Sequence, residues 1–169
     1  MNKKETLWLI GTILFVVVFF FGPSGFKSFD LSGNADINVH DTYFVIPIFH
    51  LFILISTLIF FSIYLIRMLR RNFKNLTANL IFIISNITLI LIFTFLISFV
   101  NSIKETQSTM EYPPLTDEIV ENVRNGWNSV YEILLIIQLI LIILLTISGI
   151  KTGLNYKKKN KKNTMHNNL

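Results

Sequence analysis

Residues 80–100 read L-I-F-I-I-S-N-I-T-L-I-L-I-F-T-F-L-I-S-F-V, an apolar run of 21 residues without a charged side chain. An α-helix needs about 20 apolar residues to cross the hydrocarbon core of a bilayer, so this run predicts a membrane span. Three more apolar runs occupy residues 7–22, 45–66 and 131–150, of which the first is the shortest and the last contains Glu132. With 52% hydrophobic and 15% charged residues and a mean hydropathy of +0.58, the chain is too apolar for a soluble domain. We therefore expect an all-α integral membrane protein with four transmembrane helices.

Charged residues divide unevenly between the two sides of this four-span topology. One side carries twelve of the 15 lysines and arginines: those before the first span, between the second and third, and after the fourth. The opposite side, with the outer loops 23–44 and 101–130, carries nine of the ten acids. The positive-inside rule therefore predicts that both termini are cytoplasmic. Because the composition is also typical of an AT-rich bacterial genome, we expect a multi-pass protein of the bacterial cytoplasmic (inner) membrane.

The net charge of +5 follows from these topology-determining residues. The same side chains attract anionic headgroups, so membrane lipids are expected partners. No nucleic-acid motif accompanies the charge, and we expect no nucleic-acid partner. Because the chain contains no cysteine, disulfides, thiolate metal sites and iron–sulfur clusters are excluded.

We expect one membrane domain over residues 1–155 and a disordered basic cytoplasmic tail over residues 156–169, which are rich in lysine and asparagine. An amphipathic helix on the outer membrane surface is expected before the fourth span, starting after Thr116 and bending at Gly126. The first apolar run is also compatible with a cleaved signal peptide. We favour an uncleaved span, because residues 22–25 read Gly-Pro-Ser-Gly, a helix stop rather than a cleavage site.

Polar residues recur at regular spacing in the second and third spans. In the second span they fall every seven residues, which predicts a polar seam facing protein or a cavity rather than lipid. Its members are Tyr43, His50, Thr57 and Tyr64. In the third span they share roughly one helix face, which favours hydrogen bonds between helices over a transport path. Its members are Asn79, Asn86, Thr94 and Asn101.

The stretch D-I-N-V-H-D-T-Y-F-V-I-P-I-F-H, residues 36–50, leads into the second span and holds two of the three histidines. Its first five residues alternate polar and apolar, which predicts an extended approach to the membrane. We expect Asp41 or Thr42 to cap the incoming helix, whose first amides need acceptors. Pro47 is then expected in the first helical turn, where proline is tolerated.

Three side chains of this stretch are candidate ligands. His40 and Asp41 are adjacent and could hold a divalent cation that keeps several waters, most naturally magnesium or manganese, with help from a second element. His50 is predicted about one turn inside the apolar span, where an imidazole needs a hydrogen bond, a proton path or a metal. Haem iron is one candidate metal, because histidine ligates it and aromatic walls suit the macrocycle. A hydrogen-bonded histidine without a cofactor is the other interpretation.

The same stretch resembles a signature of subunit I of the haem–copper (cytochrome c and quinol) oxidases. Residues 40–45, H-D-T-Y-F-V, and the Phe-His pair at residues 49–50 match the family's H-D-T-Y-[YF]-V-V-A-H-F-H. In that family the motif leads into the tenth helix, which runs from the outer face to the cytoplasm. The second span here is predicted to run the same way.

The resemblance implies a role for each matching ligand. His40 and Asp41 match residues that bind magnesium or manganese near the haem propionates, and His50 matches an axial ligand of the low-spin haem. Ile48 stands where the family has the axial histidine of the oxygen-binding haem, so that ligand is lost. Pro47 replaces the usual alanine.

The resemblance covers about a dozen of the 169 residues, and the sequence holds no copper-binding histidine set. We therefore expect no oxidase activity from this chain. We expect a small non-catalytic inner-membrane protein that binds haem or a divalent ion with a partner, or associates with a respiratory complex or with copies of itself. One alternative is a structural or interaction protein without a cofactor. Another is a proton- or ion-conducting protein, whose path would use His50, Thr57, Tyr64 and Glu132.

Overall fold

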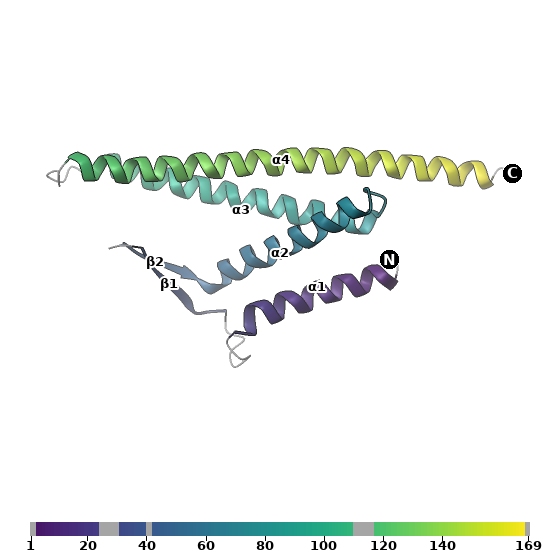
Figure 1. The fold of residues 1–169 in the computed structure, drawn as a ribbon, viewed down its shortest axis with the longest axis horizontal. Coiled ribbons are helices and arrows are strands. Elements are labelled where there is room, and N and C mark those ends of the chain that lie inside the picture. The colour runs from purple at the N-terminus through teal and green to yellow at the C-terminus, as the bar shows by residue number, and fades with distance from the viewer. Residues whose placement is uncertain (1–2, 24–30, 40–41, 110–116, 168–169) are drawn as a thin grey trace. The chain divides into compact units, whose positions relative to one another are not determined.

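The computed structural model describes residues 3–23, 31–39, 42–109 and 117–167 of the chain. In chain order the elements are α1 (Lys3–Phe21), β1 (Asn34–Val39), β2 (Thr42–Pro47), α2 (Ile48–Arg70), α3 (Leu76–Thr109) and α4 (Asp117–Asn167). All four of these helices are long and apolar enough to cross a membrane (Figure 1). The prediction of an all-helical core with four helices able to span a membrane is confirmed. A two-stranded sheet is added to it.

The spanning segments extend into the polar flanks of the apolar runs. They cover Lys3–Phe21, Ile48–Arg70, Leu76–Glu105 and Gly126–Lys158. A helix already nucleated by an apolar core adds flanking residues at little cost, so the ends lie beyond those of the runs. Two ends are exceptions, because the first segment stops one residue earlier and the second starts three residues later than predicted. The 23 residues of the second segment still rise about 34 Å, enough for a hydrocarbon core of about 30 Å.

The delay in the second span is caused by an antiparallel hairpin. Strands β1 and β2 pair from Val39↔Thr42 to Asn34↔Pro47. The extended approach predicted from the alternating pattern is confirmed as β1. The assignment of residues 45–47 to a membrane helix is wrong. The β2 sequence T-Y-F-V-I-P is rich in β-branched and aromatic residues, which favour a paired strand.

The start of α2 is held by the backbone rather than by a side-chain cap. Its N-cap is Pro47, with φ −58° and ψ 131°, and no side chain caps it. The Ile48 amide instead donates to Gly33 O at 2.9 Å. The prediction that Asp41 or Thr42 caps the helix is therefore wrong, because α2 begins at Ile48. Pro47, which was expected in the first helical turn, is instead the N-cap residue just before the helix.

Helix α4 is continuous over 51 residues, from Asp117 to Asn167 (Figure 1). The bend predicted at Gly126, between a surface helix and the fourth span, is absent. One glycine costs a helix interior only about 1 kcal/mol, which flanking turns offset. The structure also differs from the disordered tail predicted from residue 156, since α4 continues to Asn167. Lysine is a good helix former, and extending an existing helix requires no new nucleus.

Packing divides the chain into two compact units. One consists of Met1–Ser85 with Ser148–Leu169, and the other of Asn86–Ile147. The first unit contains α1, the hairpin, α2 and the adjoining parts of α3 and α4. The second contains the remaining parts of α3 and α4.

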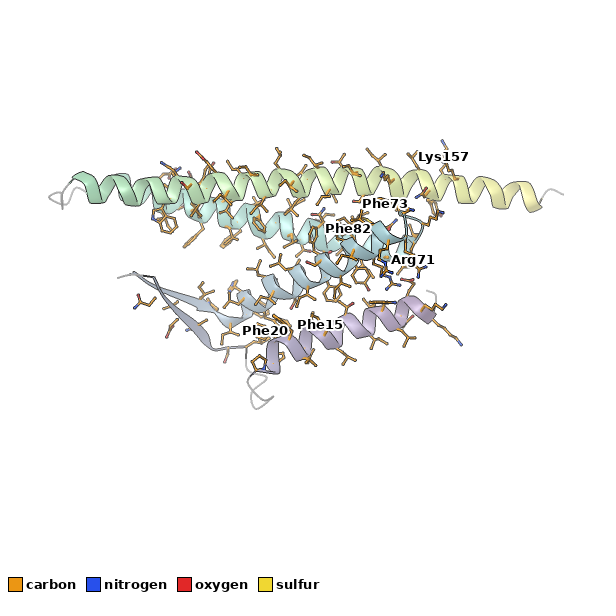
Figure 2. The ribbon with its side chains drawn as sticks, viewed as in Figure 1. Phe15, Phe20, Arg71, Phe73, Phe82 and Lys157 are labelled. Atoms are coloured by element: carbon orange, nitrogen blue, oxygen red, sulfur yellow. The ribbon has the colours of Figure 1, made fainter. Side chains whose placement is uncertain are left out.

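Aromatic side chains form much of the core of the first unit. Phe82 of α3 is fully buried, and its ring centroid lies 5.3 Å from that of Phe61 of α2. Closer to the hairpin, the Phe20 ring of α1 meets the Phe52 ring of α2 edge-on, with centroids 5.0 Å apart. Figure 2 shows Phe20 on the side of α1 that faces α2. These contacts hold α1, α2 and the start of α3 together.

Candidate functional site

His50 lies in the first turn of α2 and is exposed. Its ring contacts the neighbouring Phe49 ring edge-on, with centroids 6.0 Å apart and planes inclined by 79°. The prediction that His50 lies about one turn inside the span is wrong, because the preceding residues to Pro47 are strand rather than helix. An imidazole in this position faces outward at the end of a span, where lipid headgroups or another protein can meet it.

The two other candidate ligands, His40 and Asp41, lie outside the described residues. They separate the paired residues Val39 and Thr42 in the sequence. Within the part of the chain that the structure describes, no group of three or more histidine, aspartate or glutamate residues could hold a metal ion. The described residues therefore add no third ligand to the predicted magnesium or manganese site.

The described side chains do not form a haem site within this chain. His50 is exposed, so the described side chains do not enclose its imidazole. The second axial position would need another donor. The side chain of His166 and the whole of His40 lie outside the described part of the structure. Within the described side chains His50 is the only histidine, so they supply one imidazole to a haem iron.

The polar seam predicted along the second span changes character along its length. Tyr43 belongs to β2, so the helical part starts at His50. Thr57 donates from Oγ1 to Ile53 O of its own helix at 2.7 Å. Tyr64 is 1% exposed, so the seam faces protein at this end. The prediction that it avoids lipid is thus met at Tyr64 but not at the exposed His50.

A buried ion pair joins α1 to α2. Arg67 Nη2 lies 2.6 Å from Glu5 Oε1, and the two side chains are only 9% and 8% exposed. The Arg67 guanidinium also lies over the Trp8 ring, 4.8 Å from its centroid. Glu5 is in the first turn of α1 and Arg67 in the last turn of α2. Each charge therefore complements the dipole of its own helix, and antiparallel packing brings the two helix ends together.

Two hydroxyl groups complete this buried polar cluster. Thr12 is 3% exposed, and its Oγ1 donates to Trp8 O at 2.8 Å. The Tyr64 hydroxyl interacts with Thr12 and with the charges of Glu5 and Arg67. It makes no hydrogen bond of good geometry within the described residues. We call the four buried residues, Glu5, Thr12, Tyr64 and Arg67, the buried polar cluster. The Trp8 ring beside Arg67 is itself 55% exposed.

The charges of this cluster were not identified as a site from the sequence. In the sequence, Arg67 belongs to the basic group that predicts the topology, together with the exposed Arg70 and Arg71. One signal pointed to it, because Glu5 is the single acid on the basic side of the predicted topology. An isolated acid beside a membrane span is a candidate for an ion pair with a nearby base.

The polar face predicted on the third span is confirmed as a helix–helix contact in the first unit. Asn79 is fully buried, and its Nδ2 donates to Thr152 Oγ1 of α4 and to Phe73 O, each at 2.9 Å. Asn155 of α4 donates to the same Phe73 carbonyl at 3.1 Å. Phe73 has a positive φ of 60°, which turns its carbonyl out of the helical direction. Asparagine amides from two helices thus hold the α2–α3 turn.

The same polar face continues in the second unit. Asn86 is fully buried and donates from Nδ2 to Leu141 O of α4 at 3.1 Å. Gln138 of α4 donates from Nε2 to Thr94 Oγ1 at 2.8 Å. Asn101 departs from this pattern, because its amide bonds to Glu105 within α3 at 2.9 Å.

Glu132, the acid of the predicted ion path, is exposed in α4. Lys104 lies over the ring of the neighbouring Tyr131, 4.5 Å from its centroid. Polar contacts in this unit thus connect α3 to α4.

Comparisons of the chain with protein-family models, with curated proteins and with solved structures gave no match. Fold and function are therefore inferred from the residues of this chain alone. Two features stand out for function: the exposed His50 at the hairpin end of α2, and the buried polar cluster at its other end.

Proposed function

We propose that this chain is a small, non-catalytic protein of the bacterial inner membrane that associates with another membrane protein through the hairpin end of α2. In this proposal both termini are cytoplasmic and His50 faces the partner. The observation that carries it is the exposed imidazole in the first turn of a spanning helix. At the end of a span, an exposed imidazole beside apolar side chains can hydrogen-bond to a partner protein while those side chains pack against it.

The surroundings of His50 support a protein contact. Phe49 is 50% exposed and Val45, in the adjoining strand, is 57% exposed. Only 6% of the most apolar window of α2 is buried inside this chain. An exposed aromatic ring beside a histidine offers both packing area and a hydrogen-bonding group, the combination that anchors many interfaces.

The resemblance to the oxidase subunit suggests what His50 contributes. It would supply one imidazole to haem iron at the interface, and the partner, a respiratory complex or a second copy of this chain, would supply the other ligand. His40 and Asp41 remain the proposed ligands of a magnesium or manganese ion, completed from outside this pair. Without a cofactor, the imidazole would donate a hydrogen bond to the partner.

A reduced-minus-oxidised optical spectrum of the membrane complex, purified in mild detergent, tests the haem role. His50→Ala is compared with wild type and with His166→Ala, the same change at another histidine. We expect a haem band and co-purifying partner in wild type and in His166→Ala, and loss of both in His50→Ala. Full haem content and unchanged partner association in His50→Ala would refute the proposal.

A cofactor-free interaction protein is the second candidate, and the hairpin favours it. The bond from the Ile48 amide to Gly33 O fixes the start of α2 without any imidazole. Under this alternative, replacing both His40 and His50 by glutamine leaves folding and partner association unchanged. The first proposal expects the double variant to fold but to lose its partner.

A further inference from the structure

A shallow, open cavity of about 440 Å³ lies along α1 in the first unit, with one lining residue from α2. It is lined by Leu7, Trp8, Gly11, Thr12, Phe15 and Ile63. The walls are apolar except for Thr12, whose hydroxyl proton is already donated to Trp8 O. Figure 2 shows Phe15 on the side of α1 that faces α2. The volume falls within the range of about 300–1,000 Å³ that is typical of ligand sites.

Gly11 keeps this cavity open. A Cβ atom built at Gly11 would meet nothing within 4 Å, so a side chain there would enter empty space. The residue is exposed and lies in the middle of a spanning helix. The cavity is thus a hollow in a membrane-facing surface, which hydrocarbon can enter from the side.

The end of the cavity nearest the ion pair is basic. The pair between Glu5 and Arg67 aligns the start of α1 with the end of α2. Lys4 therefore lies at this end, four and seven residues before the lining residues Trp8 and Gly11, and so on the same helix face. Lys4 is exposed, and the neighbouring carboxylate of Glu5 is engaged by Arg67.

Helix α2 adds a second cation to this end. Arg70 lies seven residues after Ile63, the α2 residue that lines the cavity, and therefore on nearly the same face. It is exposed in the last turn of α2. An apolar hollow with two exposed cations at its polar end matches the chemistry of an anionic lipid.

We propose that this cavity binds an anionic phospholipid, with one acyl chain between α1 and α2 and the phosphate held by Lys4 and Arg70. The apolar walls cover the chain, and the two cations favour a phosphate-bearing headgroup with net negative charge over a zwitterionic one. The ion pair between Glu5 and Arg67 joins the two helices at the polar end of the cavity. This site is independent of His50 and of the partner proposed above.

Native mass spectrometry of the full chain, titrated with phosphatidylglycerol or phosphatidylcholine, tests the acyl-chain site. Gly11→Leu places a side chain in the cavity, and Gly153→Leu is the matched control, because Gly153 is also an exposed helical glycine with nothing within 4 Å of its Cβ position. We expect phosphatidylglycerol binding to weaken more than about tenfold in Gly11→Leu, since several methylene contacts are lost, and to stay unchanged in Gly153→Leu. Equal binding by both variants would refute the site.

The headgroup is tested with the double variant Lys4→Gln/Arg70→Gln. We expect it to bind phosphatidylglycerol and phosphatidylcholine equally, whereas wild type prefers phosphatidylglycerol. A preference that survives the double substitution would overturn the phosphate assignment. A changed oligomeric state in Gly11→Leu with unchanged lipid binding would overturn the proposal by assigning the cavity to a second copy of the chain.

A fluorescence measurement needs no change in the cavity itself. In the Trp127→Phe variant, Trp8 is the remaining tryptophan of the chain. We expect phosphatidylglycerol with a brominated acyl chain to quench Trp8 more strongly than brominated phosphatidylcholine does at equal mole fraction. Equal quenching by the two lipids would contradict a site for an anionic lipid beside Trp8.

Discussion

Glu5 Oε1 and Arg67 Nη2 lie 2.6 Å apart and join the first turn of α1 to the last turn of α2. Both side chains are more than nine-tenths buried, so neither charge is well solvated without the other. The Trp8 ring covers the guanidinium, and Thr12 and Tyr64 complete the surroundings. This cluster fixes how the first two spans are aligned.

Removing one member of the ion pair should therefore destabilise the protein strongly. Arg67→Met leaves the Glu5 carboxylate buried without a counter-charge, which costs about 3–5 kcal/mol for buried pairs. Unfolding in a graded mixture of mild and denaturing detergent, followed by circular dichroism, measures the loss. Arg71→Met is the control, because Arg71 is exposed and should change stability by less than about 0.5 kcal/mol.

The double variant Glu5→Gln/Arg67→Met measures the coupling energy between the two side chains, apart from what each contributes alone. It leaves no buried charge, so we expect it to be more stable than Arg67→Met alone, by a coupling of about 1–3 kcal/mol. The same detergent titration measures this double-mutant cycle. Additive losses would show that the two side chains stabilise the helices independently.

The buried amide of Asn79 should stabilise the contact between α3 and α4. Asn79→Ala removes bonds to Thr152 and to the Phe73 carbonyl, and we expect a loss of about 1–3 kcal/mol. Asn101→Ala is the control in the same helix, since Asn101 is exposed and bonds only one turn away, to Glu105. Equal stability of the two variants in thermal unfolding would argue against a structural role for the Asn79 amide.

Aromatic packing against α3 can be tested with two phenylalanines of the same helix. Phe82 is fully buried, whereas Phe95 is 71% exposed. We expect Phe82→Ala to cost about 3 kcal/mol, the low end of the range for soluble cores, because lipid replaces water as the competing environment. Phe95→Ala should have little effect on thermal stability, and a comparable loss would mean that Phe95 is covered by another molecule.

Substitutions at Gly33 and at Gly153 should change the stability of the protein in opposite directions. A Cβ at Gly33 would lie 3.1 Å from Ile48 Cδ1, so Gly33→Val should disturb the bond from the Ile48 amide to Gly33 O and destabilise the start of α2 by about 1–3 kcal/mol. Gly153→Ala has open space and should stabilise α4 by up to about 1 kcal/mol. Hydrogen exchange at the Ile48 amide, faster in Gly33→Val than in wild type, reports the local effect. Unchanged exchange would mean that Ile48 moves aside without loss of the bond.

Much of the fold was predictable because the strongest signals are local. A run of 21 uncharged residues specifies a span wherever it occurs, and the regular spacing of Asn79, Asn86 and Thr94 predicts a polar helix–helix face. The alternation before His40 likewise predicts β1. Each of these inferences needs only residues that are close in sequence.

The features that were missed depend on pairing across the sequence. Residues 45–47 are apolar and continue into the span, so their strand conformation follows only from pairing with β1. Because α2 begins only at Ile48, His50 lies in its first turn and is exposed. The contact between Glu5 and Arg67 depends on how α1 and α2 align, which hydropathy does not specify.

The ion pair also has a consequence for the order in which this protein is made. α1 is synthesised before α2, so Glu5 leaves the ribosome long before Arg67 does. Until the second span arrives, the first carries a carboxylate without its counter-charge at the membrane boundary, an arrangement that resists stable insertion. We therefore expect α1 and α2 to enter the bilayer together as a helical hairpin, because α1 inserts stably only once α2 supplies Arg67. Glu5 and Arg67 therefore influence how the protein inserts into the membrane as well as how the folded protein is held together.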